Sequence, residues 1–304
     1  MDKNKLYHQF LNVMKKEDVL VDEPMKNHTS FKIGGPADIL LLPGSVEEVK
    51  RAIEICHREE VPYFVMGNGS NLLVRDKGMR CVVIKIAENF NNVTINGRNV
   101  VAEAGILLST LSKRIVKQHL KGFEFASGIP GTLGGAITMN AGAYGGEMKD
   151  VVKNCKVLNE EGKVLDLSLA ELELGYRTSV VQIKNYIVLE ATIELEEGNY
   201  EEIKAIMDDL TEKRTTKQPL HLPSAGSTFK RPPGYFAGKL IQDADLKGAR
   251  VGGAQVSELH SGFVVNVDHA TAEDVLKLIA LVQKTVHEKF GVQLEPEVRI
   301  IGEA

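Results

Sequence analysis

A run of glycines between residues 127 and 147, SGIPGTLGGAITMNAGAYGGE, constrains the fold more than any other part of the chain. Seven of the chain's 28 glycines fall between Gly128 and Gly146. Such a run could be a flexible linker, but apolar anchors such as Ile129, Leu133 and Ile137 are interspersed through it. We therefore interpret it as ordered backbone that passes close to a large ligand, because glycine has no side chain to block the approach.

A second glycine cluster lies within residues 65–73, VMGNGSNLL, where a predicted strand ends. Its glycines allow backbone N–H groups to turn toward an anion. The cluster has neither the Lys-Ser/Thr ending of a Walker A loop nor the GxGxxG spacing of a dinucleotide fingerprint. Taken alone, a tight turn after a strand explains it equally well. Together, the two clusters predict a nucleotide cofactor with a diphosphate, without selecting which one.

The composition excludes several classes of protein. Hydrophobic residues make up 43% of the chain and charged residues 26%, as in ordinary soluble globular proteins. A formal net charge of -4 disfavours a general nucleic-acid binder. The N-terminus, MDKNKLYHQF, lacks the apolar core of a signal peptide, and no apolar run approaches the ~20 residues of a membrane span.

The three cysteines, Cys56, Cys81 and Cys155, are far apart in the sequence. They form no CxxC pair and no cluster with metal-ligand spacing, so we expect no metal site. Free cysteines and the absence of a signal peptide are typical of a cytoplasmic protein.

Helical patterns begin at recognisable caps. Ser45 with Glu48 predicts a capping box followed by a helix. Asn199 predicts a helix start, with Ile203, Ile206, Met207 and Leu210 on one face. Thr271 predicts the start of the last long helix and Gly291 its end. The inward residues of that helix are expected to be Val275, Ile279, Val282, Val286 and Phe290.

Strands alternate irregularly with these helices, which predicts a mixed α+β architecture rather than a regular βαβ repeat. Hairpins are expected around Asn96-Gly97 and in VLNEEGKVLDL, residues 157–167. Other strands are expected at 62–66, 81–86, 99–104 and 298–302. Domain boundaries are expected near residue 88 and within residues 213–226.

A basic stretch runs from Lys213 to Gln242, with six positive residues and no acidic one. Such a stretch suggests an anionic ligand, since Lys and Arg pair with phosphate and carboxylate. A solvated surface or a nucleic-acid patch beside Phe229, Tyr235 and Phe236 is the plainer alternative. Within the stretch, Ser227 follows Gly226 on a turn that could present its hydroxyl, but no GxSxG elbow surrounds it. Ordinary hydrolase chemistry is therefore not supported.

Seven segments of the chain resemble the UDP-N-acetylenolpyruvoylglucosamine reductase family, in the order in which that family has them. They span nearly the whole chain, which makes the resemblance specific. The segments are NHTSFKIGGPAD (27–38), VMGNGSNLLV (65–74), SGIPGTLGGAITMNAGAYGGE (127–147), GYRTS (175–179), KRTTKQP (213–219), SAGSTFKRP (224–232) and EPEVRIIG (295–302).

The resemblance implies an α+β fold whose FAD-binding part is of the vanillyl-alcohol oxidase type. It implies two FAD-binding subdomains, residues 1–87 with a returning strand at 293–304, and residues 88–212. It also implies a substrate-binding domain, residues 213–292. This cofactor fold is not a Rossmann fold, in agreement with the missing GxGxxG.

The implied reaction is the NADPH-dependent reduction of the enolpyruvyl ether of UDP-N-acetylglucosamine to UDP-N-acetylmuramate, a step in peptidoglycan synthesis. The family's catalytic trio falls on Arg177, Ser227 and Glu297. Ser227 is expected to donate the proton to the substrate α-carbon, with Lys230 as a candidate to stabilise the alkoxide. Arg177 is expected to hold the substrate carboxylate, and Glu297 to polarise the same region.

The resemblance also implies which residues bind the cofactor and the substrate. Noncovalent FAD is expected on the first glycine cluster, the second glycine segment and Arg214, and the substrate on four basic residues. The FAD residues are Gly67, Asn68, Gly69, Ser70, Asn71, Gly128, Ile129, Pro130, Gly131, Gly134, Gly135, Ala136, Asn140, Gly142, Tyr144, Gly145 and Arg214. The substrate residues are Lys217, Lys230, Arg231 and His260.

The chain resembles the shorter form of the family. The longer form carries an insertion with a tyrosine after the GYR segment, whereas only 21 residues separate Arg177 from Asn199 here. The longer form also has an asparagine where this chain has Arg231.

Two rival hypotheses are an oxidase of the same cofactor fold with covalent flavin and a non-catalytic nucleotide-sugar sensor. No obligate protein partner is indicated.

Overall fold

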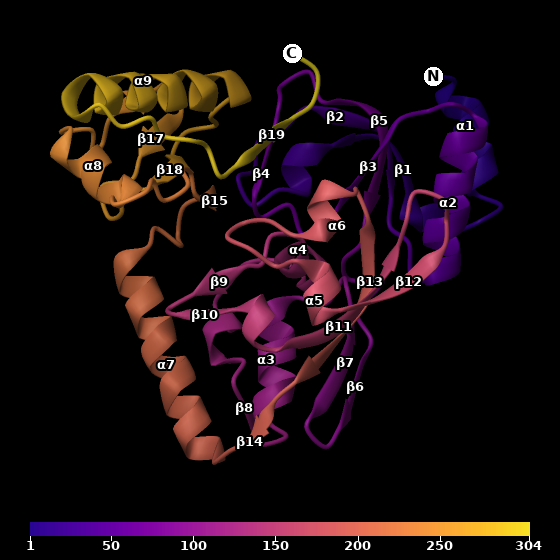
Figure 1. Ribbon diagram of the computed structural model, residues 1–304. Coiled ribbons are helices and arrows are strands. Elements are labelled where there is room, and N and C mark those ends of the chain that lie inside the picture. Colours follow the sequence, from indigo (N-terminus) through magenta and orange to yellow (C-terminus); the bar gives the residue numbers. More distant parts are fainter. The chain divides into compact units, whose positions relative to one another are not determined.

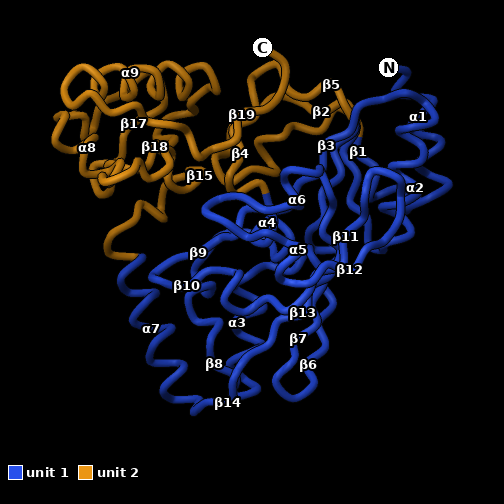
Figure 2. The backbone as a smooth tube through the Cα atoms, viewed as in Figure 1, with its two compact units in different colours: residues 1–20, 39–68, 82–214 blue, residues 21–38, 69–81, 215–304 orange.

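The computed structural model describes residues 1–304, which divide into two compact units (Figure 2). Unit 1 comprises residues 1–20, 39–68 and 82–214. Unit 2 comprises residues 21–38, 69–81 and 215–304. Each unit is thus assembled from segments that are remote in the sequence. The three-part division expected from the resemblance stays a prediction.

Helices and strands alternate irregularly along the chain, as the sequence predicts (Figure 1). The helices are α1 (Lys3–Phe10), α2 (Val46–Arg58), α3 (Leu108–Val116), α4 (Leu133–Thr138), α5 (Leu169–Leu172), α6 (Val180–Ile183), α7 (Tyr200–Lys217), α8 (Ala237–Asp243) and α9 (Ala272–Phe290), with short 3-10 turns at Lys16–Asp18, Met25–Asn27, Glu124–Ala126 and Met148–Asp150. The strands are β1 (Val19–Pro24), β2 (Pro36–Leu41), β3 (Tyr63–Met66), β4 (Leu72–Val74), β5 (Met79–Lys85), β6 (Val93–Asn96), β7 (Asn99–Glu103), β8 (Leu120–Lys121), β9 (Gly142–Ala143), β10 (Gly146–Glu147), β11 (Val152–Leu158), β12 (Val164–Ser168), β13 (Ile187–Glu194), β14 (Glu196–Glu197), β15 (Ser224–Ser227), β16 (Arg250–Val251), β17 (Ala254–Val256), β18 (Phe263–Asn266) and β19 (Arg299–Ile301).

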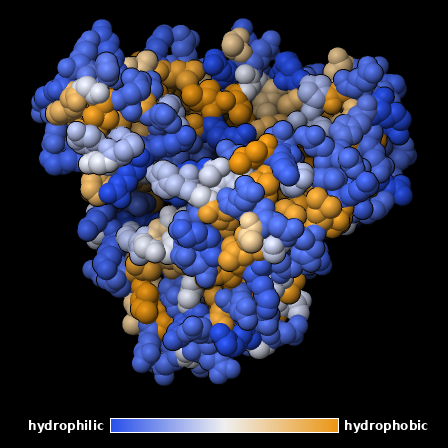
Figure 3. Space-filling model, in the orientation of Figure 1, coloured by the Kyte–Doolittle hydropathy of each residue, from blue (hydrophilic) through white to orange (hydrophobic).

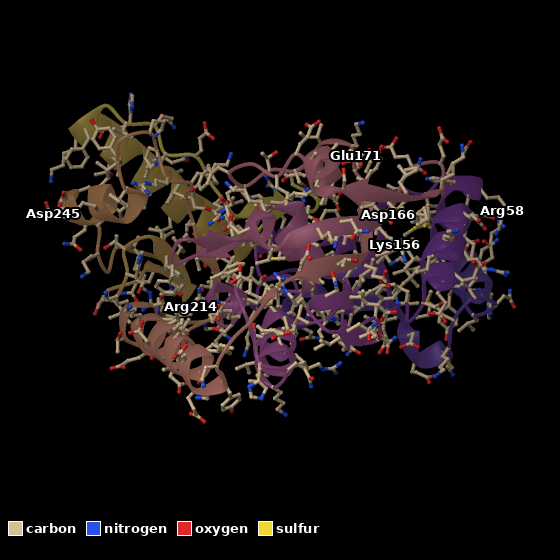
Figure 4. The ribbon with its side chains drawn as sticks, turned by 60° about the horizontal axis from the view of Figure 1, so that its bottom comes forward. Arg58, Lys156, Asp166, Glu171, Arg214 and Asp245 are labelled. Carbon is tan, nitrogen blue, oxygen red and sulfur yellow. The ribbon has the colours of Figure 1, made fainter.

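Unit 1 contains a five-stranded antiparallel sheet in the order β12-β11-β13-β7-β6. One hydrophobic cluster joins this sheet to α2, α3 and α4 and to the parallel pair β3–β5. The helix α4, which is part of the glycine segment, packs on β13 and β7. On the sheet, Lys156 of β11 lies opposite Asp166 of β12 (Figure 4). Lys156 also pairs with Glu190 of β13.

Unit 2 contains a four-stranded antiparallel sheet in the order β15-β18-β17-β16. Its core includes the inner face of α9 and three side chains from early segments of the chain, Phe31, Ile33 and Leu73. The closing strand β19 pairs in parallel with β4, from Arg299 opposite Leu72 to Ile301 opposite Val74. The predicted returning strand is therefore confirmed as a strand, with β4 as its partner.

The predicted caps and turns are confirmed, with two corrections. Ser45 caps α2 by accepting from the Glu48 N–H, but the Glu48 carboxylate accepts from Gly44 rather than from Ser45, so the reciprocal capping box is wrong. In the first hairpin Asn96 pairs with Asn99, so the turn residues are Gly97 and Arg98 rather than Asn96-Gly97. Gly97 has φ +55, a conformation that favours glycine.

The two long helices differ in how far their apolar faces are buried. In α9 the predicted inward residues are buried except Phe290, which is partly buried, and Thr271 and Gly291 cap the ends as predicted. In α7, capped by Asn199, Ile203 is buried whereas Ile206 is 50% exposed.

The visible surface is mostly hydrophilic (Figure 3), and no helix has the length and apolarity required to cross a membrane.

Candidate functional site

Gly67, the first residue of one glycine cluster, lies against Thr132 of the other within unit 1. A Cβ atom added at Gly67 would lie 2.2 Å from Oγ1 of Thr132. Thr132 is 2% exposed and caps α4 by accepting from the N–H of Gly135. The end of β3 and the start of α4 are therefore packed so closely that residue 67 has no room for a side chain.

Within the segment 128–146, glycine is required chiefly because the chain packs against itself. An added Cβ would lie 2.9 Å from the Ala104 Cβ at Gly134, 2.7 Å from a main-chain oxygen at Gly142, and 2.8 Å from the Phe125 ring at Gly146. Gly145, with φ +91, instead has no atom within 4 Å of that position. Much of the glycine content of this segment therefore serves internal packing, a role that the sequence interpretation of close approach to a ligand does not include.

Arg214 is a buried cation beside this segment. It lies on α7 (Figure 4). It is 9% exposed and has no acidic partner in the structure. Its side chain runs against Gly128, where an added Cβ would lie 3.0 Å from its Cδ and Nε, and its guanidinium faces the Tyr144 ring at 5.9 Å. A buried cation without a counter-ion is costly, so this position indicates an anionic ligand.

Arg177 occupies a tight turn that the glycine segment braces. Gly175 and Thr178 bond to each other across the turn, and Arg177 has φ +57, a conformation rare for a residue with a side chain. Asn140 donates from Nδ2 to the Gly175 carbonyl at 3.1 Å, and Ser179 donates from Oγ to the Thr138 carbonyl at 2.6 Å. Arg177 is half-buried, and its guanidinium carbon lies 5.2 Å from the Tyr176 ring centre.

Asn140 is fully engaged by protein groups. It is 1% exposed, donates also to the Glu147 carboxylate at 2.7 Å, and accepts from the Lys149 N–H at 3.0 Å. The placement of Asn140 on FAD stays a prediction, and in the structure its side-chain contacts brace the Arg177 turn. Nothing in the glycine-rich sequence around Asn140 predicts this bracing role.

Backbone pairing in unit 2 brings the segment that follows Ser227 against the segment that contains Glu297. The Glu297 N–H donates to the Thr228 carbonyl at 2.8 Å, and the Lys230 N–H donates to the Glu295 carbonyl at 2.8 Å. Between them, Phe229 pairs with Pro296 as an isolated bridge. The residue before this ladder is Ser227, which is exposed at the end of β15. Two of the three predicted catalytic residues therefore lie on neighbouring backbone segments.

Asn71, at the end of the glycine cluster 67–71, is hydrogen-bonded to the backbone of residues 297 and 299. Its Nδ2 donates to the Glu297 carbonyl at 3.2 Å, and its own carbonyl accepts from the Arg299 N–H at 3.0 Å. The other members of the cluster are half-buried, apart from Gly69, which is buried.

The four predicted substrate residues all lie in unit 2 but differ in their surroundings. Lys217 is exposed at the end of α7, and Lys230 forms an exposed ion pair with Glu295 at 3.2 Å. The Arg231 guanidinium lies 4.0 Å from the Phe236 ring centre. His260 sits in the loop before β18, two residues from the Gly262 carbonyl that accepts from the Thr228 N–H.

His260 is held as a neutral ring. Burial lowers the pKa of this imidazole below its ordinary value. Its Nδ1 accepts from the Gly262 N–H at 3.1 Å, so the proton of the neutral ring is on Nε2. The ring also packs edge-on against Phe263, with the ring centres 5.0 Å apart. His260 can therefore donate one hydrogen bond to a ligand but does not contribute a positive charge near neutral pH.

The remaining predicted FAD residues differ in exposure. Ile129 and Gly131 are half-buried and Ala136 is 4% exposed, while Pro130, Gly135 and Tyr144 are exposed. A cleft of about 510 Å³ in unit 2 lies elsewhere, lined by Lys32, Asn266 and His269 among others, and contains none of the predicted site residues.

Comparison with known proteins agrees with these features. Residues 37–168 match the family model for an FAD binding domain, and residues 218–301 match that for the C-terminal domain of UDP-N-acetylenolpyruvoylglucosamine reductase. The UDP-N-acetylenolpyruvoylglucosamine reductase of Alkaliphilus metalliredigens is 69% identical over 303 residues, covering 100% of both chains.

Two solved structures extend the comparison. The crystal structure of UDP-N-acetylenolpyruvylglucosamine reductase from Thermus caldophilus is 37% identical, with a TM-score of 0.80 over 93% of this chain and 97% of that one. P-cresol methylhydroxylase, at 15% identity and a TM-score of 0.50 over 96% of this chain and 65% of that one, shares the fold alone. The predicted fold class is confirmed, and the chain belongs to the UDP-N-acetylenolpyruvoylglucosamine reductase family.

Proposed function

We propose that Arg177, Ser227 and Glu297 carry out the family reaction on this chain. The chain is an FAD-dependent oxidoreductase of peptidoglycan precursor synthesis. Its reaction is the NADPH-dependent reduction of the enolpyruvyl ether of UDP-N-acetylglucosamine to UDP-N-acetylmuramate. The observation that supports the residue assignment is the pairing of residues 228–230 with 295–297, which sets Glu297 opposite Thr228, the residue after Ser227.

The residues of unit 1 fit a dinucleotide cofactor. The supporting observation is Arg214, a buried cation without an acidic partner, lying against the glycine segment. We propose that Arg214 pairs with an FAD phosphate and that Gly67 and Asn68 approach the diphosphate through their N–H groups. When bound, FAD supplies the hydride chemistry by which electrons from NADPH reach the alkene.

A change at Arg214 should have opposite effects on the apoprotein and on cofactor binding. Arg214→Met keeps much of the length of the side chain but removes its charge, and so removes a buried, unpaired cation from the apoprotein. We expect the apoprotein to unfold at a higher temperature than the wild type, while FAD affinity falls about 10–100-fold, as for loss of a hydrogen bond to a charged group.

Thermal unfolding of the FAD-free protein and a fluorescence titration with FAD measure the two effects. Lys213→Met is the matched control, because Lys213 is an exposed neighbour already paired with Asp209. A lower melting temperature for apo Arg214→Met would show that the protein itself compensates this charge, and the proposed phosphate partner would then be wrong.

Reduction of the alkene at its β-carbon leaves negative charge on the α-carbon and on the carboxylate attached to it. A cation must stabilise this charge and a proton donor must reach the α-carbon. We assign the proton transfer to the Ser227 hydroxyl. Serine is a weak acid, so its effectiveness depends on position and on neighbours that stabilise its alkoxide.

Arg177 and Glu297 supply the surrounding electrostatics in this proposal. The Arg177 guanidinium binds the substrate carboxylate, whose two oxygens match its planar donors. Its strained turn supports a functional role, because left-handed backbone at a non-glycine residue is retained where the surroundings impose it. Glu297 polarises the carboxylate region beside Ser227, and its main-chain bonds hold it there.

The substrate diphosphate is assigned to Lys217, with Arg231 and His260 as further contacts. Lys217 has no acidic partner in the structure and is available to an anion, whereas Lys230 is already paired with Glu295. We therefore rank Lys217 above Lys230 for this role. His260 would donate from Nε2 rather than pair by charge, since its pKa is lowered.

Anaerobic stopped-flow spectroscopy tests the function in two halves. The first mixes the flavoprotein with NADPH and follows bleaching of the flavin. The second mixes the reduced protein with the enolpyruvyl sugar and follows return of the colour, with UDP-N-acetylmuramate identified by mass spectrometry. Reduction without reoxidation by this sugar would refute the assigned substrate.

The absorption spectrum of the purified protein tests how the flavin is attached. We expect the flavin to pass into the supernatant after acid precipitation, because we propose noncovalent binding. A flavin that stays with the precipitate would favour the covalent oxidases of the same fold.

We also propose that the enzyme works in the cytoplasm and thereby supports cell shape and division. Depletion of the protein should then produce rounded or lysing cells.

A further inference from the structure

The main chain of Glu297 is held on both sides by hydrogen bonds from different parts of unit 2. Its N–H donates to the Thr228 carbonyl at 2.8 Å. Its carbonyl accepts from Nδ2 of Asn71 at 3.2 Å. Two residues further on, the Arg299 N–H donates to the Asn71 carbonyl at 3.0 Å. Asn71 thus closes a small ring of bonds around residues 297–299.

This arrangement needs the amide of asparagine. The Glu297 carbonyl requires a donor, and Nδ2 of Asn71 is a donor, whereas the carboxylate of an aspartate is not. The segment it holds is short, because β19 begins only at Arg299 and the bridge from Phe229 reaches only Pro296. Between these points, the bond from Asn71 fixes the direction of the Glu297 carbonyl.

We propose that Asn71 is a positioning residue for Glu297. It acts through the Glu297 peptide group and sets the direction in which the carboxylate leaves the backbone. The inference rests on the proposed role of Glu297 and departs from the sequence prediction, which placed Asn71 on the FAD diphosphate. A displacement of about 1 Å at a catalytic group can slow a reaction about a hundredfold, so loss of this bond should be visible in the chemistry.

The test uses the full-length holoenzyme and separates the two half-reactions. Asn71→Asp preserves the shape of the side chain but replaces the donor with an acceptor, and Asn71→Ala is the second variant. We expect flavin reduction by NADPH to stay within about twofold of the wild type. We expect reoxidation by the enolpyruvyl sugar to slow about 10–100-fold, more for Asn71→Asp than for Asn71→Ala. We also expect its pH profile to change, because the carboxylate of Glu297 has moved.

Gln283→Ala is the matched control. Gln283, on α9, donates from Nε2 to the Leu294 carbonyl at 2.8 Å, the same kind of bond to the same returning segment, three residues before Glu297. We expect this variant to lose thermal stability to a similar extent but to keep both half-reactions. If Gln283→Ala slows reoxidation as much as the Asn71 variants do, the effect is one of stability and the inference is wrong.

Two readouts do not depend on turnover. Hydrogen exchange followed by mass spectrometry should speed up in the peptide covering 295–301 for Asn71→Asp, beyond any change in Gln283→Ala. The FAD dissociation constant of the apoprotein should stay within about threefold of the wild type. A loss of FAD affinity above about tenfold with unchanged exchange would make Asn71 a cofactor ligand only and overturn the inference. Failure of the wild type itself to reduce the sugar would refute the proposed function instead, while exchange would still decide the role of Asn71.

Discussion

Ser227→Ala should slow reoxidation of the reduced flavoprotein by the enolpyruvyl sugar about 10²–10⁴-fold, the usual contribution of a positioned general acid. Flavin reduction by NADPH should remain nearly intact, because no proton is delivered to a substrate carbon in that half. Ser227 is exposed at the end of β15, and the Thr228 that follows it is anchored by its own bonds to Gly262 and Val264. The substitution should therefore leave the fold unchanged.

Stopped-flow measurement of the two half-reactions checks this expectation. Ser227→Cys is the matched variant, since it retains a proton donor of lower pKa at a similar position. Ser224→Ala is the control, because it removes the same hydroxyl from the opposite end of β15, away from the pairing with residues 295–297. We expect Ser224→Ala to keep both half-reactions. If Ser227→Ala keeps both halves at wild-type rates, the proton comes from another group and the assigned role is wrong.

Gly67→Ala should destabilise unit 1 by about 2–3 kcal/mol, the upper part of the range for overpacking a core. The new Cβ would lie 2.2 Å from Thr132 Oγ1. The φ of Gly67 is not in the left-handed region, so alanine strains no dihedral there and the clash alone is responsible. We also expect flavin to be lost on purification, because the same loop approaches the diphosphate in our proposal.

The double substitution Gly67→Ala/Thr132→Ala identifies the cause. Thr132→Ala alone should cost about 1 kcal/mol for the lost helix cap, but it removes the clashing oxygen and leaves the nearest atom, the Cβ of residue 132, at 3.4 Å. The double variant should therefore be less destabilised than the sum of the singles by more than about 1 kcal/mol. Additive effects in thermal unfolding would refute the contact.

Gly135→Ala is the stability control for this pair. It lies in α4, where an added Cβ would be at an ordinary 3.6 Å from Thr132 Oγ1. Alanine is the better helix former, so the apoprotein should be as stable as the wild type or slightly more so.

Local sequence signals predicted most of the regular structure. The caps Asn199 and Thr271 and the end at Gly291 were readable because capping is decided within a few residues. The Ser45–Glu48 capping box failed because a glutamate can reach the N–H of either of two preceding residues, and here it reaches Gly44. The shared face of α7 was predicted but its exposure was not, since periodicity predicts which residues share a face but not how much of it is covered.

Motifs predict which residues form the candidate site, whereas the bonds that hold these residues have no signal in the sequence. Ser227 and Glu297 are 70 residues apart in the chain, and only the register of residues 228–230 against 295–297 shows that their backbone segments are neighbours. In the sequence, Asn71 and Asn140 are ordinary members of glycine-rich segments. In the structure, both donate to main-chain carbonyls of remote segments. Such long-range side-chain bonds leave no local pattern in one sequence.

The parallel pairing of β4 with β19 has a consequence for synthesis of the protein on the ribosome. Residues 72–74 find their strand partner only when residues 299–301 have been translated. At ~5–20 residues per second, the earlier strand waits roughly 10–45 seconds. During that time Phe31, Ile33 and Leu73, each at most 3% exposed in the finished protein, have no core to enter, because the rest of unit 2 begins at residue 215. Newly made chains should therefore depend on chaperones until residues 299–301 have been translated, and a nonsense mutation just before codon 299 should be as damaging as one near codon 215.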